Sequence, residues 1–422
     1  MAVFPSVRKN MLFASLAYAF FALTQWGIVV VLSRIGTPED VGTLTVLTAL
    51  ITPIFLLANM DMRNGHSADD LTDFSPSDYF ALRLWSSFLA VLLILLIAFT
   101  YFSSSGFFVQ ISAIAYAVVK FFGAQINMNH GVFQRAERMD FVARSLLCQG
   151  VFGLTAFTIG YYFSGNLSVA FLAEAAAWCL SLLVIDRRLL SNLGKNIGLD
   201  AVLKVSLRTV LRLARWTLPL GLAVFLMAAA GSIPRLVLER NVDLSAVGVF
   251  GAIAYINIAL NIVGNAIGSS SSARLRRLYR FGKKSKFLQL SLILTFLSAF
   301  IGGVLCLSVY LFGEQVLTLM YGAFYANIEV FKITILAAAI RLMAAPLQFS
   351  INAGQAFWRR MLNNSVVFSI SVVFSALLIP EYGLIGAAWA MVALSAAHLL
   401  LSVVSLYVVV RKIDHPDEKV KF

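Results

Sequence analysis

Charged residues are scarce in this chain of 422 residues: only 13% are charged, whereas 60% are apolar. Soluble domains contain about 25% charged and roughly 45–50% apolar residues. A water-soluble protein of the present composition would expose large apolar patches and aggregate. The composition therefore excludes an ordinary soluble protein and predicts an integral membrane protein, with no room left for a soluble catalytic domain.

Cysteine and histidine are also rare, at three and four residues. Cys148, Cys179 and Cys306 all lie inside apolar runs, and none has the paired spacing of a zinc site. We therefore predict neither a disulfide nor a metal site. His130 and His398 have no ligand-like partners in the sequence pattern and are interpreted as packing residues.

The apolar runs have the length of membrane-spanning helices, which need about 20 residues each. They predict an all-α integral membrane protein with about 12 transmembrane helices. The expected spans lie near 11–33, 41–60, 83–102, 107–128, 142–163, 167–185, 216–238, 246–269, 287–312, 329–350, 363–380 and 384–409.

The net charge of +13 comes from cations that gather in alternate loops between these runs. If both termini are cytoplasmic, all but six of the 33 Lys and Arg residues lie on the inner side, and Arg83 is one of these inner cations. This bias is typical of cytoplasmic loops and predicts a multi-pass protein with both termini in the cytoplasm. The basic loops are accordingly expected to contact anionic membrane lipid and not nucleic acid.

Two segments of the first half recur in the second half. Residues 29–47, VVVLSRIGTPEDVGTLTVL, match residues 235–253, RLVLERNVDLSAVGVFGAI, at a spacing of 206 positions. At a spacing of 221 positions, Lys120 matches Arg341 and Arg138 matches Arg359. A duplication is predicted, with a six-helix bundle over 1–185, a basic cytoplasmic linker over 186–215 and a second six-helix bundle over 216–422.

Two bundles with an even number of spans enter the membrane the same way round. They are therefore expected to be related by a pseudo-two-fold axis along the membrane normal, with a cavity between them. This arrangement is typical of a transporter. A channel is less favoured, because the sequence contains no filter-like repeat and no ring-forming acidic motif.

Several stretches at helix ends also resemble a known family. They are LSRIGTPEDVGTLTVLTAL (32–50), GVFQRAERMDFVARSLLCQG (131–150), LERNVDLSAVGVFGAIAYI (238–256), LFGEQVLTLMYGAFYANIEVFKI (311–333) and IPEYGLIGAAWAMVALSAA (379–397). The chain resembles the polysaccharide flippases of the multidrug/oligosaccharidyl-lipid/polysaccharide exporter (MOP) superfamily. The resemblance covers the whole chain, but each motif is loose.

The resemblance implies a transporter, and not an enzyme, of the bacterial cytoplasmic (inner) membrane. Its implied substrate is an undecaprenyl-pyrophosphate-linked oligosaccharide, moved to the outer leaflet by alternating access for O-antigen and lipopolysaccharide, capsule or exopolysaccharide synthesis. Implied partners are membrane lipid, a polysaccharide polymerase and glycosyltransferases. No cofactor is implied, apart from a coupling proton or sodium ion.

Charged residues inside spans are the candidate site residues, because such charges are expensive in a bilayer and usually face a cavity or a partner. Lys120 and Arg341 lie deep in the fourth span of each half, and two cations facing one cavity would attract a pyrophosphate. For Lys120 two other interpretations remain open: neutralisation by Glu174, or extension of its amine toward the inner interface.

The remaining candidates have two interpretations each. Glu174 is either a coupling group or a structural counter-ion. Asp61, at the inner end of the second span, either has one of these roles or meets the head group of the substrate, although a solvated loop is the default there. Arg34 and Arg240, with Arg235 one turn deeper, either guide a charged sugar or phosphate outward or anchor helix ends. As anchors they would pair with an acid from this set: Glu39, Asp40, Glu239 or Asp243.

Two other functions stay open. A cation-coupled multidrug exporter of the same superfamily is expected to hold acids in its cavity, whereas the deep charges here are mainly basic. A membrane-embedded glycan polymerase or transferase needs paired carboxylates for acid–base or metal chemistry. Acids are sparse here, at 20 residues, so no catalytic residue is predicted.

Overall fold

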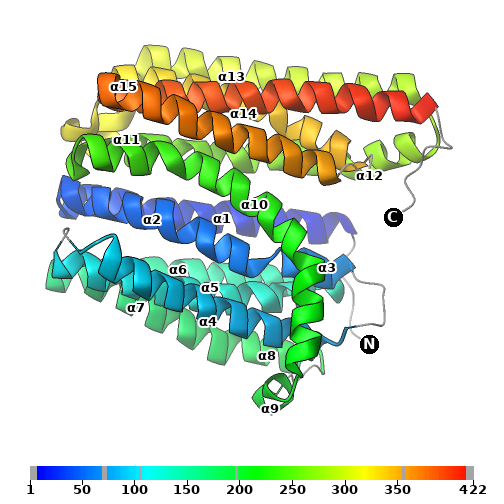
Figure 1. Cartoon of the computed structure of the whole chain (residues 1–422), viewed down its shortest axis with the longest axis horizontal. Helices are drawn as coiled ribbons and strands as arrows, with labels where there is room; N and C mark the ends of the chain where they lie inside the picture. The colour runs from blue at the N-terminus through cyan, green and yellow to red at the C-terminus, as the bar shows by residue number, and fades with distance from the viewer. Residues whose placement is uncertain (1–6, 69–73, 104–105, 195–197, 354–356, 415–422) are drawn as a thin grey trace. The chain divides into compact units, whose positions relative to one another are not determined.

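The computed structural model describes residues 7–68, 74–103, 106–194, 198–353 and 357–414, and its elements are all helical (Figure 1). The first part of the chain forms α1 (Val7–Ile35), α2 (Pro38–Asn59), α3 (Met62–Ala68), α4 (Pro76–Thr100), α5 (Phe107–Arg135), α6 (Met139–Ser164), α7 (Leu167–Leu180), the π-helix η1 (Ser181–Asp186), α8 (Arg187–Ser191) and α9 (Leu199–Leu203). The rest forms α10 (Leu207–Asn241), α11 (Leu244–Ala254), α12 (Ile256–Arg280), α13 (Lys284–Tyr321), η2 (Ala323–Tyr325), α14 (Ile328–Ala353) and α15 (Phe357–Asp414).

Capping boxes fix the starts of two helices. Thr37 caps α2 by accepting a hydrogen bond from the Asp40 amide, while the Asp40 carboxylate accepts one from the Thr37 amide. Ser75 and Asp78 make the same reciprocal pair at the start of α4. Because each box satisfies amides that have no partner inside the helix, it sets the first helical residue. For α4 this residue is Pro76, seven positions before the expected start of the third span.

Two compact units make up the chain, Met1–Ala228 and Ala229–Phe422, so that their boundary falls within α10. In the first unit α6 packs against α1 and α7, and α5 packs against α4 and α7. In the second unit α14 packs against α12, α13 and α15. The expected division into two bundles joined by a linker over 186–215, and the pseudo-two-fold axis between them, remain predictions.

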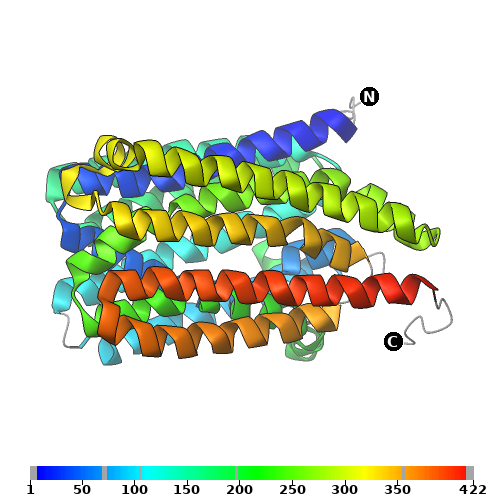
Figure 2. The same ribbon diagram turned by 90° about the horizontal axis from the view of Figure 1, so that it is seen from above.

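The last helix, α15, reverses direction at Gly383, where φ is 54° and ψ is −124°. A positive φ is readily adopted by glycine, and Pro380 lies one turn earlier. Both views show the two halves of α15 side by side (Figures 1 and 2). The eleventh and twelfth expected spans are these two halves.

Ten helices of the described residues are long and apolar enough to cross a membrane. The eighth expected span, near 246–269, is broken at Tyr255 into α11, which is short, and α12, which is not apolar enough to qualify. A total of 12 spans is therefore not directly seen and remains a prediction.

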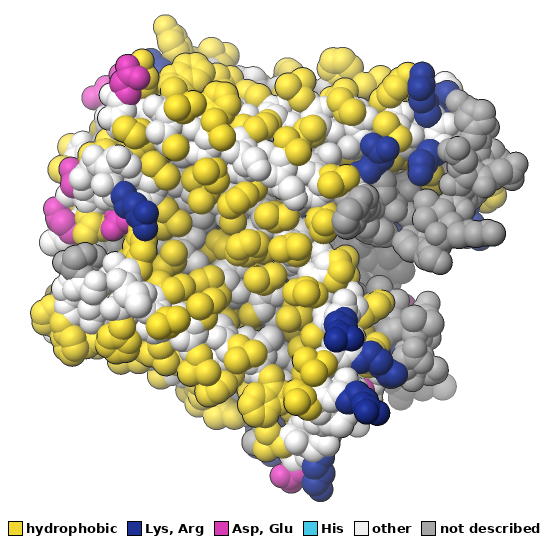
Figure 3. Space-filling model, in the orientation of Figure 1, with side chains coloured by type: hydrophobic (Ala, Val, Ile, Leu, Met, Phe, Trp, Pro, Cys, Tyr) yellow, Lys and Arg dark blue, Asp and Glu magenta, His cyan; other side chains and the backbone are white. Residues whose placement is uncertain are grey.

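Charged side chains sit mainly at the ends of the helices. On the face seen in Figure 3, apolar side chains cover the middle of the helices in each unit. In the second unit, acidic side chains gather at the end that holds the α10–α11 connection and the turn of α15, and most basic ones at the opposite end. This distribution fits helices with apolar middles and wet ends; the sidedness of the termini remains a prediction.

Trp178 of α7 is the central packing residue of the first unit. Its indole Nε1 donates to the Gln149 carbonyl at 3.1 Å. The ring lies against Gly123 of α5 and Gly153 of α6: a Cβ added to these glycines would lie 2.6 and 2.5 Å from indole atoms. The helices α5, α6 and α7 therefore pack closely at this point, because α5 and α6 each contribute a glycine to the contact with Trp178. Small residues at such contacts are common in membrane proteins.

We predict that Gly153→Ala destabilises the protein by about 1–3 kcal/mol, because the added methyl group forces the indole out of its seat. The measurement is the thermal unfolding of the purified protein in detergent. Gly303→Ala in α13 is the matched control, since nothing lies within 4 Å of its added Cβ. An equal loss of stability in both variants would contradict this packing role.

Candidate functional site

Glu174 is one of two buried acids in the described chain, with 2% of its surface exposed. It lies on α7 one turn before Trp178, so that both side chains face α5 and α6. The groups that act on its carboxylate are the amine of Lys120, from α5, and the side chain of Gln25, from α1.

Lys120 lies near this carboxylate but is not locked to it. Its Nζ sits 4.8 Å from the centroid of the Tyr116 ring, a cation–π contact within α5. Among the described residues, no acid lies within 4.0 Å of the Lys120 amine. The structure thus brings Lys120 and Glu174 together, as one interpretation of the sequence expected, while leaving the amine without a direct anionic ligand.

Arg235 and Arg341 form the corresponding basic cluster of the second unit. Arg235 comes from α10 and Arg341 from α14, and the charge of Arg235 acts on Arg341. The side chain that acts on Arg235 is Tyr255, at the break between α11 and α12. The Nε of Arg235 is buried without a hydrogen-bond partner. Among the described residues, no acid lies within ion-pair distance of either guanidinium.

Polar groups of α15 extend this cluster. The charge of Arg341 acts on His398, whose Nε2 lies 3.3 Å from the amide nitrogen of Gln348 in α14. That amide donates to the Ser402 hydroxyl at 2.7 Å. His398, interpreted from the sequence as a packing residue, is therefore buried beside the cluster, and its Nδ1 has no partner.

Arg34 and Arg240 lie in the last turns of α1 and α10, and both are exposed. Two of the acids expected to pair with them make other contacts. Asp40 accepts a hydrogen bond from the Tyr161 hydroxyl at 2.7 Å, and the Asp243 side chain caps the first turn of α11. The structure does not bring Arg34 or Arg240 into either buried cluster.

Asp61 lies in the short break between α2 and α3, where Met60 and Asp61 both have positive φ. Its charge acts on Arg83 of α4, a fully buried residue that also donates to the Asn59 side chain. Arg83, counted from the sequence among the cations of the inner side, is buried within α4, and its side of the membrane remains a prediction. Because the capping box at Ser75 sets the start of α4 at Pro76, Arg83 lies within the helix, near Asp61 in the break between α2 and α3.

These side chains suit the binding of charge and not bond-making chemistry. The first unit presents an amine near a buried carboxylate, and the second presents two guanidiniums with a neighbouring imidazole and amide. All three cysteines are free thiols. In the described part of the chain, no group of three or more His, Cys, Asp or Glu side chains has the arrangement of a metal site.

The chain was compared with known protein families, sequences and structures. No family model matches the chain. Over 382 residues it is 28% identical to the capsular polysaccharide biosynthesis protein CapF of Staphylococcus aureus, covering 90% of this chain and 94% of CapF.

Solved structures of multidrug transporters give the fold. The inward-facing conformation of a multidrug resistance MATE family transporter of the MOP superfamily matches with a TM-score of 0.67 and 16% identity, over 95% of this chain and 96% of that one. The Vibrio cholerae MATE transporter VcmN in its bent form matches with a TM-score of 0.64 and 11% identity, over 96% and 98%. The chain therefore has a MATE-like fold.

The resemblance found in the sequence motifs is confirmed at this level. This fold is all-helical, and ten helices of the described residues are long and apolar enough to cross a membrane. Sequence reasoning singled out Lys120, Glu174 and Arg341 from their depth in apolar runs, whereas it placed Arg235 near an outer helix end. It missed the environment of Arg83 and His398, because their burial depends on which helix faces pack together.

We predict that Lys120→Gln lowers the melting temperature of the protein, because the buried Glu174 carboxylate then loses the cation that acts on it. Each kcal/mol of folding free energy lost should lower the melting temperature by roughly 2–4 °C. Adding Glu174→Gln should restore most of this loss, as judged by thermal unfolding in detergent. Lys332→Gln is the matched control: Lys332 lies 4.7 Å from the Tyr310 ring but is exposed, so no change is expected. A double variant less stable than Lys120→Gln would contradict the coupling.

Proposed function

We propose that this protein moves a lipid-linked oligosaccharide with an anionic pyrophosphate head group from the cytoplasmic to the outer leaflet, in the synthesis of a capsule or related surface polysaccharide. The similarity to CapF supports the pathway, and the MOP fold supports transport. The particular observation that carries the proposal is the Arg235–Arg341 cluster, in which the charge of Arg235 acts on Arg341 and no acid of the described chain lies within ion-pair distance of either guanidinium.

The physical argument concerns the cost of like charges away from water. Charges removed from water lose hydration free energy, and like charges repel more strongly in the lower dielectric of a protein. An arriving dianionic head group offsets both costs at once. Guanidinium groups suit this ligand, because their planar fork donates two parallel hydrogen bonds to phosphate oxygens.

The roles of the individual residues follow from their surroundings. Arg341 and Arg235 bind the head group within the second unit, where Gln348 and Ser402 offer polar partners for sugar hydroxyls. Lys120, whose amine has no ion-pair partner, is proposed as a further phosphate ligand in the first unit. Glu174 acts there as the counter-ion that holds the resting charge. The exposed Arg34 and Arg240 have a lesser role, as anchors at helix ends.

A cation-coupled multidrug exporter is the second candidate, favoured by the MATE-like fold and by the buried acid Glu174. A cationic drug would need an acid in its binding cluster. The described part of the second unit buries no acid, since Glu174 and Asp186 are the buried acids and both lie in the first unit. This distribution favours an anionic substrate.

We predict that Arg341→Gln and Arg235→Gln each weaken the binding of farnesyl pyrophosphate to the purified protein at least about tenfold, because a charge-assisted hydrogen bond contributes roughly 1.5–3 kcal/mol. Lysine at either position should lie between glutamine and the native residue, since it keeps the charge but loses the fork. Binding is measured by calorimetry, with Arg276→Gln, an exposed cation of α12, as the unaffected control.

The same variants decide between the two functions in cells. Deleting the gene should abolish surface polysaccharide, and Arg341→Gln at a matched protein level should fail to restore it while Arg276→Gln succeeds. Normal polysaccharide together with increased sensitivity to cationic dyes would instead identify a multidrug exporter.

A further inference from the structure

The helix α10 is longer than a membrane span requires. It contains 35 residues, whereas about 20 suffice to cross a bilayer. The expected seventh span begins only near position 216, so the first turns of α10 belong to the segment predicted as a basic cytoplasmic linker. The structure shows that this end of the linker is helical and belongs to the first unit, which extends to Ala228.

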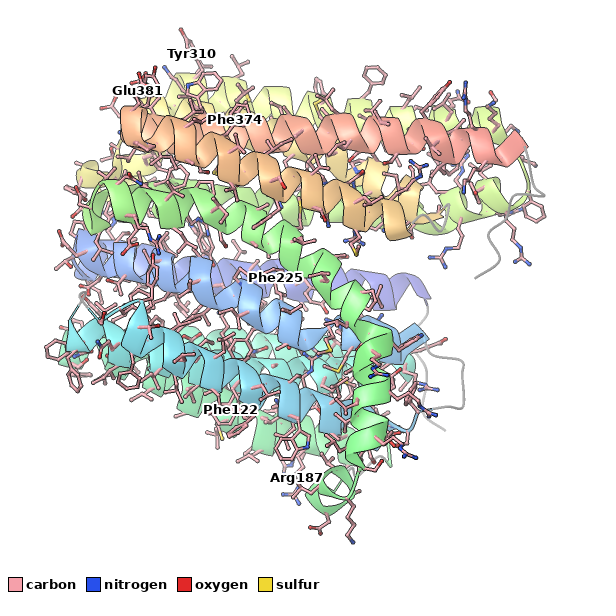
Figure 4. The ribbon with its side chains drawn as sticks, viewed as in Figure 1. Phe122, Arg187, Phe225, Tyr310, Phe374 and Glu381 are labelled. Carbon is pink, nitrogen blue, oxygen red and sulfur yellow. The ribbon has the colours of Figure 1, made fainter. Side chains whose placement is uncertain are left out.

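The direction of this part of α10 differs from that of the spans around it. It runs crosswise to α2 and α4 of the same unit (Figures 1 and 4). Arg187, at the start of the same predicted linker, lies at the edge of the unit (Figure 4). Because spans run across the bilayer, a helix that lies crosswise at their ends runs along the membrane surface.

One side of the first part of α10 is packed against the first unit. Val210 and Leu213 are buried in a cluster with Met62 of α3. A Cβ added to Gly221 would lie only 2.7 Å from the Cα of Met60, in the break between α2 and α3. This close contact fixes the rotation of the helix about its axis, and it therefore fixes which residues face outward.

The outward side carries an apolar stripe and a basic stripe. The apolar stripe is 71, 53 and 46% exposed at its three members, Leu207, Leu211 and Leu218. Their spacing places them on one side of the helix. The basic stripe has the same helical spacing and is also exposed; it contains Arg208, Arg212 and Arg215. The helix thus has a buried side, an uncovered apolar stripe and a basic stripe beside it.

The charge of this surface is positive. The sequence contains no acid between Asp200 and Glu239. Among the described residues, no acid lies within ion-pair distance of Arg208 or Arg215. Basic side chains are visible over this part of α10 (Figure 3). The protein therefore places positive charge beside leucines that it leaves uncovered.

We propose that the first part of α10, Leu207–Leu218, is an interfacial helix that binds the anionic lipid surface of the membrane. Its leucines lie among the upper parts of the acyl chains, and its arginines contact the head-group phosphates. Helices with an apolar side and a basic side lie in the plane of the membrane interface, where anionic lipid strengthens their binding. The long arginine side chains reach the head groups while their apolar stems stay beside the leucines. A linker in solution would instead leave the leucine stripe in water.

Lipid binding at this position anchors the junction between the two units. The buried side of the helix already contacts the break between α2 and α3, so the membrane surface and the protein hold α10 from two sides. Since α10 continues past Ala228 into the second unit, the anchor fixes where the chain leaves the first unit. This role uses none of the residues proposed to bind the pyrophosphate and does not depend on which substrate is carried.

The test uses an environment-sensitive NBD label on a single cysteine at Leu211, in the full-length protein with its three native cysteines replaced by alanine. The protein is placed in nanodiscs of phosphatidylcholine, alone or mixed with phosphatidylglycerol. In the mixed lipid, we expect emission at shorter wavelength and quenching by lipid that carries a spin label near its head group. Both effects should be weaker in phosphatidylcholine alone. A label at Leu207 should behave in the same way.

Two controls separate the helix from its surroundings. A label at Ser191, an exposed residue of α8, should show water-like emission and no quenching in either lipid. Arg208→Gln combined with Arg215→Gln should remove the difference between the two lipids at the Leu211 label. Arg276→Gln combined with Arg280→Gln removes the same charge from exposed residues of α12 and should leave that difference unchanged.

Three results would overturn the proposal. Water-like emission at Leu211 in both lipids would show that the leucine stripe stays in solution. Protection of the label from aqueous iodide without quenching by spin-labelled lipid would show that protein, such as a second copy of the chain, covers the stripe. Equal quenching with and without phosphatidylglycerol would show that the arginines do not recognise anionic lipid.

Discussion

The free-energy cost of holding a charge away from water is the constraint on which the functional parts of this structure depend. Over most of its length the chain avoids the cost, because its charged residues gather near helix ends. Where it accepts the cost, at Lys120 with Glu174, at Arg235 with Arg341 and at Asp186, compensation within the protein is incomplete. Charges buried in this way often mark functional sites in membrane proteins.

Close helix packing is what allows these charges to be buried at defined positions. Trp178 fills the space left by Gly123 and Gly153, and the same side of α7 carries Glu174 one turn earlier. The carboxylate is consequently held at a fixed depth between α1, α5 and α6. In the second unit, Gly264 and Gly268 of α12 allow the residues of α14 to approach closely: a Cβ at Gly268 would clash with the ring of Phe349. Small residues thus set the helix spacing, and the spacing sets where the polar side chains of neighbouring helices meet.

The helical architecture and the deep charges could be predicted from the sequence, because both depend on the composition of single segments. Apolar runs locate most helices, and a lysine or an acid inside a run is conspicuous. What could not be predicted depends on contacts between segments or on local capping. The start of α4 depends on the Ser75–Asp78 box, and it decides that Arg83 is buried and not in a loop. Asp186 looks like the solvated end of a span beside Arg187, and only the packing of α5 and α6 shows it enclosed by Asn129 and Ser145. The break at Tyr255 falls within an apolar run and has no composition signal.

The two halves of the chain share their cations but not their acids. The spacing of 221 positions that pairs Lys120 with Arg341 pairs Glu174 with Ser395 and Asp186 with Tyr407. Both buried acids of the described chain thus lie in the first unit, while the basic cluster of the second stands without one. If a deep cation served only to neutralise a structural acid, the second half would have no reason to carry Arg341 once the acid is absent. A cation at the matched position in both halves, with a counter-ion in one, is the pattern expected when the shared ligand is an external anion.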